Sequence, residues 1–150
     1  MAAPKADAQT SYRLERTIPA TPAKVYEAWT QAEGMSRWMA PADDFTVKVH
    51  CADARVGGEY RVEMLNPEGG RHVVHGSFLE LIPGKRLVLT WEWETNPAAG
   101  NSQVTVDLAP EGEGTHLTLT HDRFPDAETR DHHAQGWTGC IGRLAQMFNA

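Results

Sequence analysis

The chain has 150 residues, enough for one domain, because folding at that size buries roughly 70% of the unfolded surface without metals or disulfides. We expect a single domain over residues 10–150, after a small, polar and disordered tail over residues 1–9. Fourteen basic and twenty acidic residues give a net charge of -6, which disfavours nucleic acid and anionic membrane surfaces as partners. The chain shows no long apolar run and no signal-peptide core, so we expect a cytoplasmic protein.

The N-terminal third predicts one strand followed by two short helices. The strand is expected over residues 11–19, where apolar and polar side chains begin to alternate. Thr21 can cap the first helix and Pro22 suits its first position, because proline has no backbone N–H to lose there. Residues 33–39 predict a second short helix, which Pro41 ends.

From residue 45 onward the apolar pattern changes to strict alternation, and turn sequences recur at the spacing of an antiparallel meander. Six further strands are predicted, over residues 45–52, 59–65, 72–81, 86–94, 102–109 and 115–122. The alternation gives this sheet one apolar face and one polar face, so the apolar face needs a cover.

The cover is a long helix at the end of the chain. Pro125 and the carboxylates that follow it suit a helix start, and the helical pattern runs to about Phe148. Its apolar stripe consists of Trp137, Ile141, Leu144 and Phe148. The sequence thus predicts an α+β fold of the helix-grip type, in which a curved antiparallel sheet of about seven strands wraps around the C-terminal helix.

This order of elements resembles the START and birch-pollen-allergen (SRPBCC) helix-grip superfamily. Within it, the chain is similar to the bacterial branch named after the activator of a heat-shock chaperone's ATPase. The segments that carry the resemblance are residues 22–30, 38–41, 56–60, 83–91, 114–121 and Gly136-Trp137. The resemblance implies a ligand-binding cavity between sheet and helix, and it raises a chaperone partner and a role in stress response as further expectations.

The candidate ligand-binding residues are large inward-facing side chains that would line such a cavity: Tyr60, Met64, Trp91, Trp93, His121, His133 and Trp137. Large aromatic side chains also fill space well, so a solid core is the alternative interpretation. A cavity would suit a small apolar or aromatic molecule.

Two other classes of function stay open beside the binding of a small molecule. One is a protein-interaction module that acts on a chaperone ATPase, and the other is a cyclase-like enzyme that uses the same cavity. We predict no catalytic residue and no cofactor, so binding is favoured over catalysis. Cys51 and Cys140 are interpreted as reduced, buried thiols.

His121 and His133 are predicted to face inward and to meet at one end of the cavity. They could be hydrogen-bonded structural residues, contacts for the polar end of a ligand, or an acid–base pair. No metal site is predicted, because His72 and His75 point to opposite faces of a strand, and adjacent histidines on a helix diverge by about 100°.

Three glycines interrupt the last helix, and each costs up to roughly 1 kcal/mol relative to alanine in a helix interior. Gly139 and Gly142 are predicted to point away from the Trp137 stripe. They would leave a smooth outer strip, which suggests a homodimer packed through this face. Tolerance without any selected role is the alternative.

Overall fold

The computed structural model describes residues 10–148, so the tail predicted for residues 1–9 lies outside the described residues. The elements, in chain order, are β1 (Tyr12–Ile18), α1 (Pro22–Thr30), α2 (Ala32–Trp38), β2 (Thr46–Ala52), β3 (Glu59–Leu65), β4 (Arg71–Ile82), β5 (Arg86–Trp93), the 3-10 turn η1 (Pro97–Ala99), β6 (Asn101–Glu111), β7 (Gly114–Asp122) and α3 (Ala127–Met147). Within the described residues, no helix has both the length and the apolar character needed to cross a membrane.

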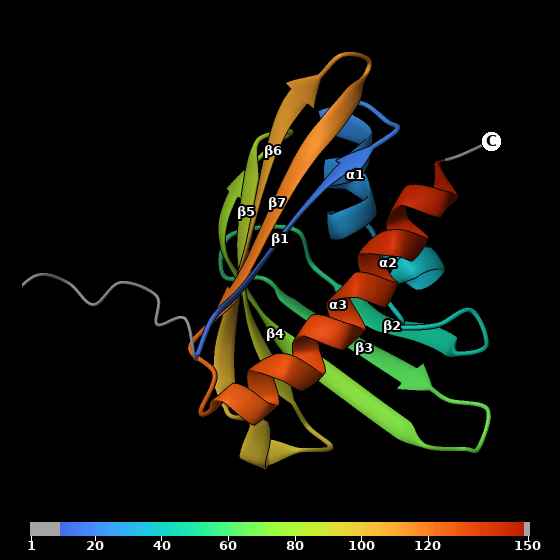
Figure 1. Ribbon diagram of the computed structural model, residues 1–150, viewed down its shortest axis with the longest axis vertical. Coiled ribbons are helices and arrows are strands. Elements are labelled where there is room, and N and C mark those ends of the chain that lie inside the picture. The colour runs from blue at the N-terminus through green and yellow to red at the C-terminus, as the bar shows by residue number, and fades with distance from the viewer. Residues whose placement is uncertain (1–9, 149–150) are drawn as a thin grey trace, which may run out of the picture.

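The seven strands form one antiparallel sheet in the order β1-β7-β6-β5-β4-β3-β2. Figure 1 shows the curved sheet with α3 lying across it, and α1 and α2 beside the C-terminal half of α3. The prediction of an α+β helix-grip fold with two short helices after the first strand is therefore confirmed.

The local signals in the sequence account for the ends of the helices. The Thr21 hydroxyl accepts a hydrogen bond from the Lys24 N–H at 3.4 Å, and Pro22 is the first residue of α1. Asp126 caps α3 by accepting from the Thr129 N–H at 2.8 Å. A cap satisfies backbone donors that a helix start leaves without partners.

Alternation along the strands fixes which face of the sheet carries the core. In β7, every second residue is buried, from Thr115 through Leu117 and Leu119 to His121. The facing stripe of α3 is buried at Trp137, Ile141 and Leu144, and Phe148 is half-buried against it. The core therefore lies between the concave face of the sheet and α3.

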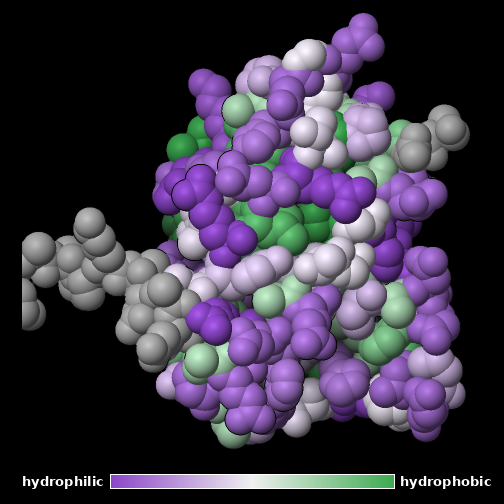
Figure 2. Space-filling view, in the orientation of Figure 1, coloured by the Kyte–Doolittle hydropathy of each residue, from purple (hydrophilic) through white to green (hydrophobic). Residues whose placement is uncertain are grey.

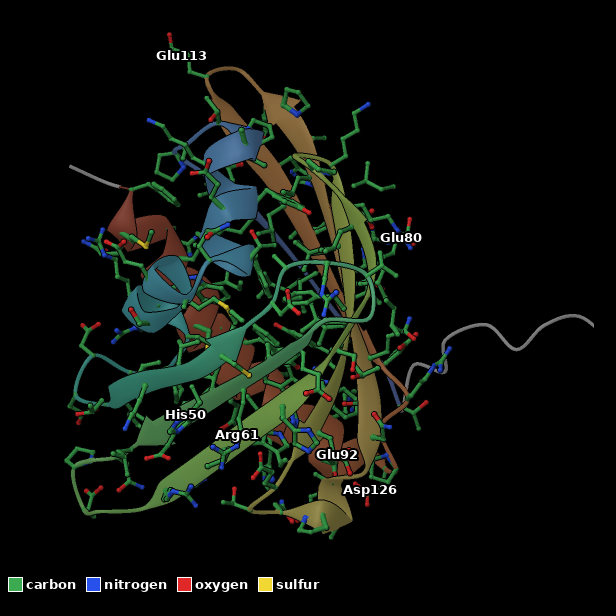
Figure 3. The ribbon with its side chains drawn as sticks, turned by 180° about the vertical axis from the view of Figure 1, so that it is seen from behind. His50, Arg61, Glu80, Glu92, Glu113 and Asp126 are labelled. Carbon is green, nitrogen blue, oxygen red and sulfur yellow. The ribbon has the colours of Figure 1, made fainter. Side chains whose placement is uncertain are left out.

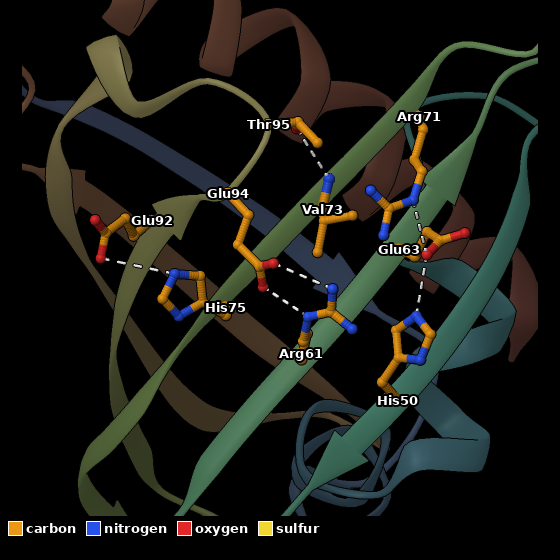
Figure 4. Close-up of polar contacts among 9 residues, drawn as sticks. All are labelled: His50, Arg61, Glu63, Arg71, Val73, His75, Glu92, Glu94 and Thr95. Carbon is orange, nitrogen blue, oxygen red and sulfur yellow. Dashed lines mark hydrogen bonds and ion pairs between the residues drawn. The ribbon is translucent and has the colours of Figure 1, made fainter.

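The opposite face of the sheet carries charged pairs that link neighbouring strands (Figures 3 and 4). His50 and Arg71 both contact one oxygen of Glu63, each at 3.1 Å. Arg61 donates to both oxygens of Glu94, at 2.6 and 3.1 Å. This face of the sheet is thus exposed to solvent, and the charged pairs across it stabilise the alignment of strands β2 to β5.

Cys51 is exposed rather than buried, contrary to the prediction, whereas Cys140 is buried. A β-bulge between Val49 and Cys51 shifts the register of β2 against β3. The extra residue reverses the alternation, so that Ala52 packs on the core in place of Cys51. The error therefore comes from a bulge that a simple period of two does not contain.

The prediction of a smooth outer strip is also wrong at Gly139. A Cβ atom added at Gly139 would lie 2.1 Å from the carbonyl oxygen of Pro41, so the loop between α2 and β2 already occupies this side of α3. One turn later, Arg143 donates to the carbonyl of Ala42 at 2.7 Å. Gly142 lies beside Arg16 of β1. Gly139 allows a close contact within the chain, which the helical period alone could not reveal.

Candidate functional site

A pocket of about 350 Å³ lies between the N-terminal half of α3, strands β3 to β5 and the loop between α2 and β2. In Figure 2, hydrophobic atoms are visible in a hollow between α3 and the strands at the lower right. The residues that line the pocket are Pro41, Phe45, Met64, His72, Trp91, Trp93, Thr95, Asn96, His132, His133, Gly136, Trp137 and Cys140. Its volume falls within the range of small-molecule sites.

The pocket is apolar in its depth and polar at its rim. The buried lining residues are Met64, Trp91, Trp137 and Cys140. The exposed ones are His72, Thr95, Asn96 and His132. Such a gradient suits a molecule that has an apolar body and one polar end.

Five of the seven residues proposed from the sequence line this pocket: Met64, Trp91, Trp93, His133 and Trp137. Tyr60 and His121 lie behind its wall instead. The Tyr60 side chain is buried and its hydroxyl donates to the carbonyl of Thr90. His121 has an exposed fraction of 0%.

Sequence reasoning missed three α3 residues that line the pocket, namely His132, Gly136 and Cys140, as well as the residues that loops and strand ends contribute. His72 could have been found, because it pairs with Met64 across β3 and β4 and so shares its face. Pro41 and Phe45 come from the α2–β2 loop, and Thr95 and Asn96 follow β5. The path of a loop depends on tertiary contacts, so the sequence carried no signal for these four.

All five tryptophans of the chain lie in one connected aromatic cluster. The ring centroids are 4.5 Å apart for Trp38 and Trp29, 5.7 Å for Trp29 and Trp137, and 4.9 Å for Trp137 and Trp91. Trp93 then meets Trp91 edge to face at 5.6 Å and 85°. Trp91, Trp93 and Trp137 therefore offer ring surfaces at different angles to one pocket.

Beneath the pocket, both ring nitrogens of His121 take part in a series of hydrogen bonds between protein groups. The Trp137 indole N–H donates to its Nδ1 at 2.9 Å, so the imidazole proton lies on Nε2. That N–H donates to the Ser102 hydroxyl at 2.6 Å, which in turn donates to the carbonyl of Trp91 at 3.0 Å. Burial holds the pKa of His121 well below its ordinary value, so the ring is neutral.

His133 and Trp93 form a second indole–imidazole hydrogen bond, at the wall of the pocket. The Trp93 indole N–H donates to Nε2 at 2.8 Å, and Nδ1–H donates to the carbonyl of Thr129 at 2.8 Å. The two imidazoles meet with ring centroids 5.0 Å apart. Both nitrogens of each ring already have partners, so neither histidine has a free position for acid–base chemistry in this arrangement.

We expect these two histidines to make the protein less stable in mild acid. Burial lowers the pKa of both folded imidazoles below the ordinary value of 6.5. As the pH falls below 6.5, the unfolded chain binds protons that the folded one excludes, so the free energy of unfolding decreases. Urea denaturation at successive pH values measures this slope.

His133→Gln is the matched variant, because an amide oxygen can still accept from Trp93 but does not titrate. Its free energy of unfolding should decrease less steeply than that of the wild type just below pH 6.5. Parallel curves for the two proteins would show that His133 does not contribute to the acid sensitivity.

A cysteine, Cys140, also lines the pocket. Burial raises the pKa of the Cys140 thiol to about 12, so the nucleophilic thiolate is absent at neutral pH. Within residues 10–148, no group of three or more histidine, cysteine or carboxylate side chains could hold a metal ion. The site therefore offers aromatic surface and a polar rim.

Comparisons with known proteins agree with this architecture. No curated protein matches the chain. A crystal structure of a protein from Chromobacterium violaceum superposes with a TM-score of 0.86 and 32% identity, over 94% of this chain and 98% of that one. The AHSA1 protein of Silicibacter pomeroyi superposes with a TM-score of 0.81 and 24% identity, over 93% and 97% of the two chains. The family model described as "Activator of Hsp90 ATPase homolog 1-like protein" matches residues 19–149. The family model covers most of the chain, and the solved protein from Chromobacterium violaceum is 32% identical to it. The protein therefore belongs to the family of Activator of Hsp90 ATPase homolog 1-like proteins.

Proposed function

We propose that this protein binds a small apolar or aromatic molecule in the pocket between α3 and strands β3 to β5. The observation that carries the proposal is a pocket of about 350 Å³ that three tryptophans line. An apolar cavity of about 150 Å³ is large enough for benzene, so this pocket has room for one or two rings with substituents. Burial of such a ring against indole faces provides the affinity.

The competing classes of function have less support. A cyclase-like enzyme would need His121 and His133 to be free for a substrate, yet their ring nitrogens are bonded to protein groups. A module that acts on a chaperone ATPase would need an apolar docking face. The large apolar side chains exposed in the described residues are Val56, Leu79 and Ile82, around β4 and the turn before β3. Three such side chains are ordinary for a protein surface.

Gly136 offers a way to close the pocket without disturbing the core. It lies in the pocket wall, and a Cβ atom added there has no atom within 4 Å in the described structure. A Gly136→Leu side chain therefore extends into the pocket, while leucine also suits a helix better than glycine does. The variant should stay folded and lose ligand affinity by about tenfold or more.

The experiment titrates the wild-type protein and the Gly136→Leu and Gly142→Leu variants with 2-methylnaphthalene, and calorimetry gives the affinity of each protein for this compound. Gly142→Leu is the matched control, because Gly142 lies on the same helix but outside the pocket wall. A Cβ atom added there meets only the end of the flexible Arg16 side chain, at 3.9 Å. We expect the wild type and the control to bind alike, with affinity in the micromolar range or weaker. Equal binding by all three proteins would place the ligand elsewhere and contradict the proposal.

A further inference from the structure

The rim of the pocket is polar and has no carboxylate in its lining, although Asp126 lies close enough to His132 for their charges to interact. Its exposed side chains are His72, Thr95, Asn96 and His132, and none of the described residues that line the pocket is a carboxylate. This is notable in a chain with twenty acidic residues and a net charge of -6. A cationic ligand would find no counter-charge in this lining, and each histidine at the rim would repel it when protonated.

The same rim side chains can donate hydrogen bonds to a ligand. The Thr95 hydroxyl oxygen accepts from the Val73 N–H at 3.1 Å, which leaves its own proton to be donated (Figure 4). The Asn96 amide brings two donors, and each imidazole of the rim brings one when neutral and two when protonated. Glu94, the carboxylate next in the chain, is bound to Arg61 on the other face of the sheet.

The apolar part of the pocket suits a flat ring. Trp91 and Trp93 meet edge to face, so their planes form a corner, and Trp137 lies against Trp91 at 46°. The indole N–H groups of Trp93 and Trp137 are bonded to His133 and His121, and the N–H of Trp91 is buried without a partner, so none of the three is offered at the exposed rim. The ring of a ligand would therefore point inward and its polar group outward.

We infer that the pocket takes an aromatic acid, with the ring against the three tryptophans and the anionic group among the donors of His72, Thr95, Asn96 and His132. This inference rests on the proposed function and specifies the class of ligand. Charge-assisted hydrogen bonds from these donors provide the selectivity. The net charge of the protein does not attract an anion over long distances, so the preference comes from short-range bonds and should persist at raised ionic strength.

The test compares three probes that share one ring system: 2-naphthoate, 2-methylnaphthalene and 2-naphthylmethylammonium. Calorimetry at neutral pH gives the affinity of each for the wild-type protein. We expect 2-naphthoate to bind about tenfold or more tightly than either of the others, since hydrogen bonds to a charged group are worth about one power of ten or more in affinity. The ratio to 2-methylnaphthalene isolates the polar group from the ring.

Two rim variants locate the donors. Asn96→Leu and His132→Leu replace exposed side chains and should fold normally, and each should lower the preference for 2-naphthoate several-fold while leaving 2-methylnaphthalene affinity within about twofold. Gln135→Leu is the matched control, because Gln135 is exposed on the same helix as His132 but lies outside the pocket wall. Its preference should equal that of the wild type.

The possible outcomes distinguish a failure of the proposed binding function from a failure of the inferred ligand class. If none of the three probes binds, the proposed function itself fails. If they bind with equal affinity, or if the ammonium probe binds most tightly, the pocket is a binding site but the inference of an aromatic acid is overturned. A preference for 2-naphthoate that both rim variants retain in full would also overturn it, because the donors would then lie elsewhere.

Discussion

Replacing Trp137 with alanine is expected to lower the free energy of unfolding by about 3–5 kcal/mol. The side chain is 3% exposed, lies between Trp29 and Trp91, and occupies the centre of the seam between α3 and the sheet. Its removal leaves a cavity and also takes away the indole N–H that the buried His121 accepts. Urea denaturation followed by circular dichroism measures the loss.

Trp137→Phe serves as the control, because it keeps an aromatic ring but lacks the N–H. It should cost about 1–3 kcal/mol, chiefly for the unpaired Nδ1 of His121. A loss below about 1 kcal/mol for Trp137→Ala would mean that α3 does not pack on the sheet through this face.

Gly139→Ala should destabilise the protein by about 1–3 kcal/mol, although alanine is the better helix former. The added methyl group would lie 2.1 Å from the carbonyl oxygen of Pro41 and 2.9 Å from its carbonyl carbon. Both atoms belong to backbone, which the Arg143 bonds to the carbonyls of Ala42 and Arg37 hold in place. The loop or the helix must move to accommodate it.

Gly142→Ala is the comparison, because its Cβ atom would meet only the end of the Arg16 side chain. This variant should gain up to about 1 kcal/mol from helix propensity. If Gly139→Ala were also stabilising, the contact between α3 and the α2–β2 loop would be absent in solution. Denaturation midpoints of the two variants, measured side by side, decide this.

Local signals were enough to predict the fold. Alternation identified the core face of β7 down to His121, and the spacing of Trp137, Ile141 and Leu144 identified the buried stripe of α3. Where prediction failed, a feature that a simple period does not contain decided the outcome. The bulge in β2 exposed Cys51, and the approach of Pro41 turned Gly139 from a free surface into a packed one.

The candidate site was only partly predictable for the same reason. The alternation in β5 identified both Trp91 and Trp93 as inward-facing. It did not show that Trp91 is buried deep in the pocket, whereas Trp93 is half-buried at its edge. Tyr60 shares the inward face of its strand, yet it is buried against Phe78 and Trp91 and does not line the pocket. Periodicity gives the direction of a side chain but not its depth.

The most direct test of a ligand site against the tryptophan cluster is the set of indole N–H signals in a proton–nitrogen NMR spectrum of the native protein. Titration with 2-methylnaphthalene or 2-naphthoate should shift the signals of Trp91, Trp93 and Trp137, which line the pocket. The signal of Trp38 should stay in place, because its N–H donates to the carbonyl of Ala28 at 2.8 Å within the core. If neither compound shifts any indole signal at saturating concentration, or if only Trp38 responds, the pocket does not bind such molecules and the account given for it is contradicted.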